Sequence, residues 1–280
     1  MTNEVEVPTT DFAPVRDGQL YYQMQGNGYP LVLIHASCAD HTMWQEQFKV
    51  FAPDFQVISY DRRGFGHTTA NLLDEAVSFF DGQDLFDLLQ HLGIKKAYVL
   101  GLSGGGLIAL DFALAFPDKI AGLILASSGF SGAEFQATPD EVALYGEYMQ
   151  LLQTKEWEQL ATLGAKLWVD GPRRATEPTR LAIQKQVYQW LLAGYHRIED
   201  MVEPRAATPA AVGRLGEIEV PTLVMWGDQD ESIILAAGET LVSQIKAAHK
   251  VVFPDTAHML NLERPEQFNQ EVLDFLQKTR

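Results

Sequence analysis

The chain has little cysteine, little positive charge and no long hydrophobic run, and each shortage excludes a class of protein. Cys38 is the only cysteine among 280 residues, so no intramolecular disulfide can form. A lone cysteine agrees with a reducing compartment. The 21 basic residues are outnumbered by 37 acidic ones, which gives a formal charge of −16. Because that charge repels nucleic acids and anionic membrane surfaces, we expect neither as a partner.

No segment approaches the roughly 18 consecutive apolar residues that a membrane-spanning helix needs. Residues 1–14 contain three acidic side chains and no apolar run, which is not the pattern of a secretory signal peptide. We therefore expect a cytoplasmic protein. The length suits one large domain that carries an insertion.

Short apolar runs alternate with helical patterns along most of the chain. The runs lie at 31–34, 57–60, 97–100, 123–125, 222–226 and 251–253, after a strand-like segment at 19–25. Runs of this length suit strands that are buried on both faces of a parallel sheet. Helical patterns lie between them at 85–92 and 107–116, and another begins at Pro265. The alternation predicts an α/β fold with a mostly parallel central sheet and helices on both faces.

The alternation breaks between 131 and 212, where helical patterns occur without a convincing buried strand. We expect an inserted helical cap at 131–212 and a core formed by 1–130 and 213–280. Four aromatic residues of the cap are candidates to line a pocket, although such residues more often form the cap's own core. They are Tyr145, Trp157, Trp168 and Trp190.

The strongest chemical motif is Gly101-Leu102-Ser103-Gly104-Gly105, a G-x-S-x-G pattern between an expected strand and an expected helix. Glycines in such a turn remove Cβ atoms that would clash. The helix start offers free N–H groups and the positive end of the helix dipole. The alternative is a glycine-rich turn or phosphate loop, but no Lys follows as a Walker motif requires. Ser103 is therefore the candidate nucleophile.

A serine hydroxyl needs a general base, which in a Ser–acid–His order must follow Ser103. The histidines after Ser103 are His196, His249 and His258. His258 lies in a loop between the 251–253 run and the last helix, where active sites form in open α/β sheets. We therefore assign His258 as the base.

The acid should also lie in a loop that follows a strand and precedes His258. Asp228 and Asp230 both follow the 222–226 run, and each is a candidate. Such an acid would hold the imidazole tautomer and stabilise its charged form. Because aspartates beside glycine often serve as turn residues, we expect one of the two to do only that.

Acyl transfer also needs donors for a negative oxygen. One donor should be the backbone N–H of Gly104, after the nucleophile, and the other an N–H in the loop after 31–34. We favour Ser37 for the second donor. His35, in the same loop, precedes Ser103 and is interpreted as a buried imidazole that fixes the loop.

These residues resemble α/β-hydrolases of the carboxylesterase and 3-oxoadipate enol-lactonase type, over nearly the whole chain. The resemblance is carried by Leu33-Ile34-His35, Trp44, Tyr60-Asp61-Arg62-Arg63-Gly64-Phe65-Gly66, Gly101-Leu102-Ser103-Gly104-Gly105, Phe116-Pro117, Trp168-Val169-Asp170-Gly171-Pro172, Gly227-Asp228-Gln229-Asp230 and Ala257-His258. It implies that Asp230 is the acid, with Asp228 supporting it, and that 61–66 is a structural turn.

The chain departs from the family pattern at two positions. The family usually has glycine after the histidine of its first loop, where this chain has Ala36. Because alanine does not freely adopt a positive φ, Ala36 is the weakest point of the expected oxyanion geometry. The residue after the nucleophile is often Met, and Gly104 shields the site less.

The resemblance implies a carboxylesterase that acts through Ser103, His258 and Asp230 without a metal or organic cofactor. Epoxide hydrolases and haloalkane dehalogenases are similar overall but use an aspartate nucleophile, against which Ser103 argues. One alternative is a lactonase, for which Arg173 and Arg174 could supply a basic pocket, although we favour a solvated loop there. Another is a small-molecule receptor with little turnover.

Overall fold

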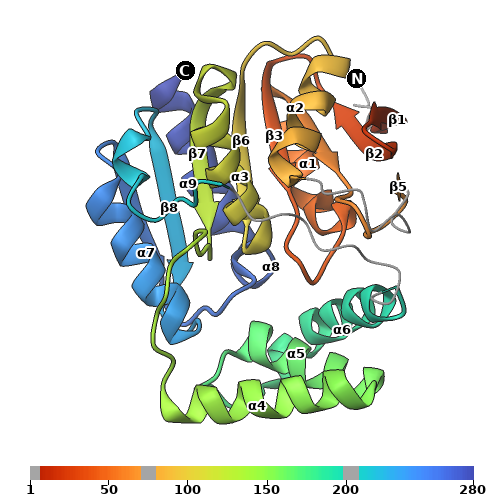
Figure 1. The fold of residues 1–280 in the computed structure, drawn as a ribbon, viewed down its shortest axis with the longest axis vertical. Helices are drawn as coiled ribbons and strands as arrows, with labels where there is room; N and C mark the ends of the chain where they lie inside the picture. Colours follow the sequence, from red (N-terminus) through yellow and green to blue (C-terminus); the bar gives the residue numbers. More distant parts are fainter. Residues whose placement is uncertain (1–6, 71–79, 198–207) are drawn as a thin grey trace.

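The computed structural model describes residues 7–70, 80–197 and 208–280, and in these ranges one sheet lies between two layers of helices (Figure 1). The strands are β1 (Thr9–Val15), β2 (Gly18–Gln25), β3 (Tyr29–Ile34), β4 (Phe55–Tyr60), β5 (Thr69–Ala70), β6 (Ala97–Leu102), β7 (Ile120–Ala126), β8 (Thr222–Gly227) and β9 (Ala248–Phe253). Their order is β1-β2-β4-β3-β6-β7-β8-β9, with β5 beside β2. Pairing is parallel from β4 to β9 and antiparallel among β1, β2, β4 and β5. The predicted mostly parallel α/β sheet is confirmed.

Helices cover both faces of this sheet, as the apolar runs predict. Helices α1 (Gln45–Phe51) and α9 (Pro265–Thr279) pack on one face, and α2 (Asp81–His91), α3 (Gly104–Ala115) and α7 (Ser232–Gln244) pack on the other. Strand β3 shows the reason, because Leu31 and Leu33 join one hydrophobic cluster while Val32 and Ile34 join the opposite one. Successive side chains of a strand point to opposite faces, so a strand covered on both sides must be apolar throughout.

Two strands at the edge of the sheet carry no such signal. Strand β1 is mostly exposed and buries only Ala13, and β5 is two residues long. An edge strand is stabilised by backbone pairing rather than by burial of an apolar run. The hydrophobic pattern therefore could not reveal either strand.

The described part of the expected insertion contains three α-helices, which lie together at one end of the molecule (Figure 1). They are α4 (Pro139–Thr154), α5 (Trp157–Asp170) and α6 (Leu181–Tyr195). Ser131 O accepts from Val212 N at 3.0 Å and Ser131 Oγ accepts from Ala211 N at 2.8 Å, so the segment leaves and returns at one point. The division into core and cap remains a prediction that this geometry supports. On α4, the apolar residues Val142 and Met149 are exposed.

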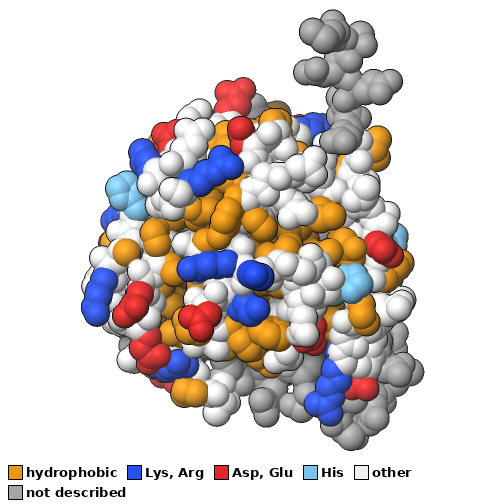
Figure 2. Space-filling view, turned by 90° about the horizontal axis from the view of Figure 1, so that it is seen from above, with side chains coloured by type: hydrophobic (Ala, Val, Ile, Leu, Met, Phe, Trp, Pro, Cys, Tyr) orange, Lys and Arg blue, Asp and Glu red, His pale blue; other side chains and the backbone are white. Residues whose placement is uncertain are grey.

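Acidic charge does not cover the whole surface of the molecule. Figure 2 views the end opposite α4–α6, where Lys and Arg side chains are interspersed with Asp, Glu and apolar ones. No helix among the described residues is long and apolar enough to cross a membrane.

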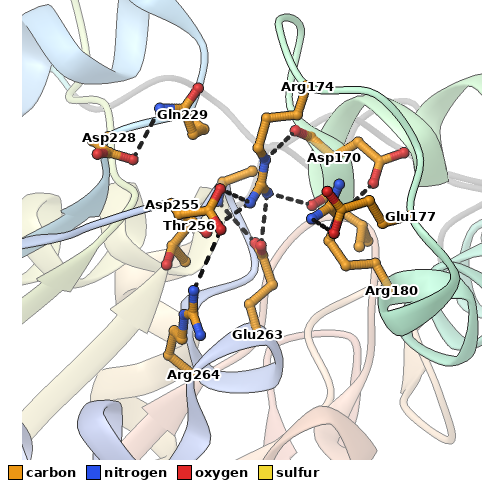
Figure 3. Close-up of polar contacts among 12 residues, drawn as sticks. Asp170, Arg174, Glu177, Arg180, Asp228, Gln229, Asp255, Thr256, Glu263 and Arg264 are labelled. Carbon is orange, nitrogen blue, oxygen red and sulfur yellow. Dashed lines mark hydrogen bonds and ion pairs between the residues drawn. The ribbon is translucent and has the colours of Figure 1, made fainter.

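A buried carboxylate fixes the turn that joins α5 to α6 (Figure 3). Asp170 is fully buried and accepts hydrogen bonds from Arg180 Nε at 2.7 Å, Gln184 Nε2 at 2.6 Å and Thr176 Oγ1 at 2.5 Å. Its partner Arg180 is 9% exposed. Removal of one member of a buried ion pair leaves an uncompensated charge, which is costly.

We predict that Asp170→Ala lowers the free energy of unfolding by about 3 kcal/mol, because the Arg180 guanidinium loses its buried partner. Urea unfolding followed by circular dichroism measures this change. Glu177→Ala is the matched control, since Glu177 pairs with the same guanidinium from a side chain that is 62% exposed. Its loss should cost less than about 1 kcal/mol. Equal effects of the two substitutions would contradict the prediction.

Candidate active site

A strained turn at Ser103 joins β6 to α3. Ser103 has φ 55° and ψ −120°, a conformation that non-glycine residues seldom adopt. A methyl group at Gly101 would lie 2.1 Å from Gly105 O, and one at Gly105 would lie 2.2 Å from Ile34 O. Both glycines of the motif are thus required by backbone packing, which lets Ser103 stand at the carboxyl end of the sheet.

His258 and Asp230 form a buried pair in the loops after β9 and β8. His258 Nδ1 lies 2.9 Å from Asp230 Oδ1 and 3.1 Å from Oδ2, and both residues are at most 3% exposed. An ionised carboxylate can only accept, so Nδ1 carries the proton and Nε2 is left as the basic nitrogen. No hydrogen bond of the described residues joins this ring to Ser103. Catalytic hydrogen bonds are often long before substrate binds.

Asp228 does not support the pair. Its side chain is exposed and accepts a hydrogen bond from Gln229 Nε2 at 3.2 Å (Figure 3). The expectation that Asp228 assists Asp230 is therefore wrong. Asp228 occupies the position of a turn residue, which was the other role considered for one of the two aspartates.

The structure brings the two expected oxyanion residues together. A methyl group at Gly104 would lie 2.2 Å from Ser37 Oγ, so the loop after β3 rests directly against the residue after Ser103. Ala36 is fully buried and is not among the described residues with positive φ. Alanine therefore imposes no strain on this loop, and the concern raised by its replacement of glycine does not hold.

His35 fixes this loop as a neutral imidazole. It is fully buried, with Nδ1 2.8 Å from Ala36 O and Nε2 accepting from Arg62 N at 3.1 Å. One nitrogen donates and the other accepts, which only the neutral ring can do. Burial, reinforced by the positive charge of Arg62, lowers the pKa of His35 to about 4. The interpretation of His35 as structural agrees with these contacts.

Comparison with known proteins agrees with this fold. The family model described as alpha/beta hydrolase fold matches residues 29–265. The chain belongs to the α/β-hydrolase fold family. A 2-hydroxy-6-oxononadienedioate/2-hydroxy-6-oxononatrienedioate hydrolase of Paraburkholderia xenovorans (strain LB400) is 28% identical over 97% of this chain and 96% of its own. These matches support the coarse assignment of this protein as a hydrolase.

Two solved structures show the same fold. An enol-lactonase from Burkholderia xenovorans LB400 has a TM-score of 0.74 at 24% identity, covering 95% of this chain and 100% of its own. A thermophilic esterase from Thermogutta terrifontis, with malate bound, has a TM-score of 0.74 at 23% identity, covering 98% and 99%. The resemblance to esterases and enol-lactonases is thus confirmed for the fold.

A second buried carboxylate of this hydrolase, Glu231, lies beside the His258–Asp230 pair. One ligand atom from each of Asp230, Glu231 and His258 lies within 4.8 Å of the others. Tyr145 OH, from α4, donates to Glu231 Oε1 at 2.5 Å. Burial raises the pKa of Glu231, although the charge of His258 and the Tyr145 hydrogen bond act in the opposite direction. The sequence carried no sign of Glu231 beyond its place next to Asp230.

These charges decide the basicity of His258. Burial lowers its pKa, but the charge and hydrogen bond of Asp230, together with the charges of Glu231 and Glu263, outweigh burial and raise the pKa above 6.5. A base of raised pKa is neutral, and able to accept a proton, only above that pKa. We therefore expect the ability of His258 to accept a proton to be lost as the pH falls through its raised pKa.

Arg173 and Arg174, the candidates for a basic pocket, bind backbone and carboxylate oxygens of other segments. Arg174 donates to Val169 O, Asp170 O and Asp255 O and pairs with Glu263 at 2.7 Å (Figure 3). Arg173 donates to Asp230 O at 2.5 Å and to Glu141 Oε1 at 3.3 Å. The loop is solvated at Arg173 and at 175–177, as expected, but both guanidinium groups are bound by other residues rather than free.

Two further hydrogen bonds join helices of the expected cap to the core. Trp168 O accepts from His258 N at 3.2 Å, and Trp190 Nε1 donates to Thr42 Oγ1 at 3.0 Å. Trp157 stacks on Tyr195 with ring centroids 6.0 Å apart. Of the aromatic candidates, Tyr145 and Trp190 therefore bridge to the core, while Trp157 packs within the cap.

The 61–66 segment is the turn that the sequence indicated. Asp61 accepts from the backbone N–H groups of His41 and His67, and a methyl group at Gly66 would lie 1.9 Å from its carboxylate. With His41 and Asp40, Asp61 forms a second group of potential metal ligands. His41 Nδ1 already contacts Asp61 Oδ1 at 2.8 Å. The expectation that the protein binds no metal stays a prediction.

We predict that Glu231→Gln lowers the pKa of His258, because the substitution removes a negative charge that stabilises the imidazolium. The measurement is a pH titration of the imidazole signals by NMR. Glu219→Gln, at an exposed position, is the matched control and should leave the pKa unchanged. A pKa that is unchanged or higher in the Glu231 variant would show that Glu231 does not act on His258.

Proposed function

We propose that this hydrolase is a carboxylesterase that cleaves small to medium carboxylic esters through Ser103, His258 and Asp230. The observation that carries the proposal is the buried His258–Asp230 pair, with Nδ1 2.9 Å from the carboxylate, together with the strained Ser103 turn at the same end of the sheet. The sheet's parallel strands end there in the loops that hold all three residues. Support for the ester class comes from the enol-lactonase and esterase folds.

The chemistry follows from the protonation states. Ser103 Oγ attacks the ester carbonyl while His258 Nε2 takes its proton, and Asp230 stabilises the resulting imidazolium. The backbone N–H groups of Gly104 and Ser37 hold the negative oxygen. His258 returns the proton to the leaving alcohol and then activates the water that releases the acid. No step needs a metal or an organic cofactor.

Two other hydrolytic reactions are candidates for the same three residues. The similarity in fold to an enol-lactonase favours a lactone. A lactone is a cyclic ester, so its acid and alcohol groups remain joined after hydrolysis. The dienedioate hydrolase of Paraburkholderia xenovorans favours a 2-hydroxy-6-oxo-dienoate, the class that its name gives. A substrate panel that contains p-nitrophenyl esters, a lactone and such a dienoate ranks the three by kcat/KM. A receptor with little turnover would bind members of the panel and hydrolyse none.

We predict that Ser103→Ala reduces hydrolysis of p-nitrophenyl acetate by at least about a thousandfold, because no nucleophile remains. Steady-state release of p-nitrophenol measures the loss. A fluorophosphonate probe should label the wild-type protein at Ser103, as peptide mass spectrometry would show. Activity retained in the variant, or labelling at another residue, would place the nucleophile elsewhere.

We predict that Asp230→Asn costs about a thousandfold or more in kcat/KM, because an amide can present the wrong tautomer to His258. Asp228→Asn is the matched control, since it makes the same change two residues away on an exposed side chain, and it should retain nearly full activity. Both variants are compared with wild type on one ester and by thermal unfolding. The reverse order of activities would reassign the acid.

A further inference from the structure

The described part of the chain places one cation beside the expected oxyanion loop without a carboxylate partner. Arg62 follows β4, and a methyl group at Gly104 would lie 3.3 Å from Arg62 Nη1. Other arginines form ion pairs with carboxylates: Arg63, the next residue, pairs with Asp84, and Arg174 pairs with Glu263. In contrast, Arg62 lies within 4.0 Å of no carboxylate of the described residues. Asp81 interacts with Arg62 only at longer range. Burial raises the pKa of Asp81, and the positive charge of Arg62 opposes that rise.

The Arg62 side chain is held in place rather than free in solvent. Its backbone N–H donates to the neutral His35 ring, and its guanidinium carbon lies 5.0 Å from the centre of the Phe65 ring. Nη1 donates to Ser37 Oγ at 3.3 Å, while Nε is buried without a partner. A cation that is partly desolvated with no anion in contact costs stability, so its placement is better explained by a ligand than by folding.

Gly104 and Ser37 leave this cation accessible. A larger residue at 104 would occupy the space beside these two side chains, since a methyl group there would lie 2.2 Å from Ser37 Oγ and 3.3 Å from Arg62 Nη1. Ser37 is exposed, and Ser103 and Gly104 are half-buried, so solvent reaches this side of the site. A substrate group that extends past the oxyanion position would therefore meet the guanidinium.

We propose that Arg62 binds a carboxylate carried by the substrate close to the scissile ester, so that the preferred substrates are half-esters of short dicarboxylic acids. This inference rests on the proposed function, because it takes Ser103 and the Gly104 and Ser37 N–H groups as the reacting site. Arginine suits the role, since its planar fork matches the two oxygens of a carboxylate. The local cation also offsets the repulsion that a chain of net charge −16 exerts on an anionic substrate.

The test compares monomethyl succinate with methyl butyrate, which differ in the presence of the second carboxylate. In Arg62→Gln, kcat/KM for the half-ester should fall by about tenfold to a hundredfold, as loss of a charged hydrogen bond implies. The value for the neutral ester should stay nearly unchanged. Arg62→Lys keeps the charge but not the fork, so it should restore part of the preference.

Arg214→Gln is the matched control, because it makes the same change in net charge at a residue whose partner is Glu217. It should leave the ratio of the two kcat/KM values as in wild type. Thermal unfolding of every variant separates recognition from loss of fold, and Arg62→Lys provides the test if Arg62→Gln is unstable. An equal loss on both esters, or an unchanged ratio, would overturn the assignment of Arg62 to carboxylate binding.

A binding experiment separates this inference from the proposed function. Calorimetric titration of succinate into Ser103→Ala protein should show binding that butyrate lacks and that the Ser103→Ala, Arg62→Gln protein loses. Arg62-dependent binding in a protein whose wild type cleaves no ester would leave the anion site standing and remove the esterase proposal. If the protein cleaves esters but binds succinate independently of Arg62, the esterase proposal stands and the assignment of Arg62 to carboxylate binding is overturned.

Discussion

The arrangement of this site depends on one packing constraint, the absence of side chains at Gly101 and Gly105. A methyl group at either position would meet a backbone oxygen at 2.1 or 2.2 Å, so any other residue would force β6, α3 and β3 apart. That closeness lets the chain turn sharply enough to hold Ser103 at φ 55°. The strain is supported by the hydrogen bond from Ser103 N to Ala126 O at 2.9 Å, at the end of the neighbouring strand β7. The turn then lies at the carboxyl end of the sheet, as do the loops after β3 and β9 that hold Ser37 and His258.

Opposite charges are separated around this turn. On one side, Asp230 and Glu231 gather about His258 and raise its pKa, and the cap reaches the same group through Tyr145. On the other side, Arg62 and the N–H groups at Gly104 and Ser37 form a positive region. Such a separation suits a reaction in which a cation develops on an imidazole while an anion develops on a carbonyl oxygen. Helix α4 of the expected cap therefore contacts the acidic group beside His258.

Much of the fold could be predicted because its causes are local. The continuous apolar run of β3 follows from burial on both faces, and the order of motifs follows from parallel strands whose carboxyl ends share one edge. Edge strand β1 was missed because backbone pairing leaves no apolar pattern. The supporting role that the resemblance implied for Asp228 was wrong, because two acids in one loop look alike in sequence. In the structure Asp228 is exposed, whereas Asp230 is only 1% exposed.

Spacing and residue type were sufficient to predict the α/β sheet, the glycine turn around Ser103 and His258 as the candidate base. The pairing of charges became visible only in the folded chain. Arg173 and Arg174, prominent in the sequence, are held by backbone oxygens and by Glu141 and Glu263. Arg62, which the sequence placed in a structural turn, stands beside Gly104 without a carboxylate within 4.0 Å among the described residues. Pairing of charges depends on distances between segments far apart in the chain, and no local pattern records those distances.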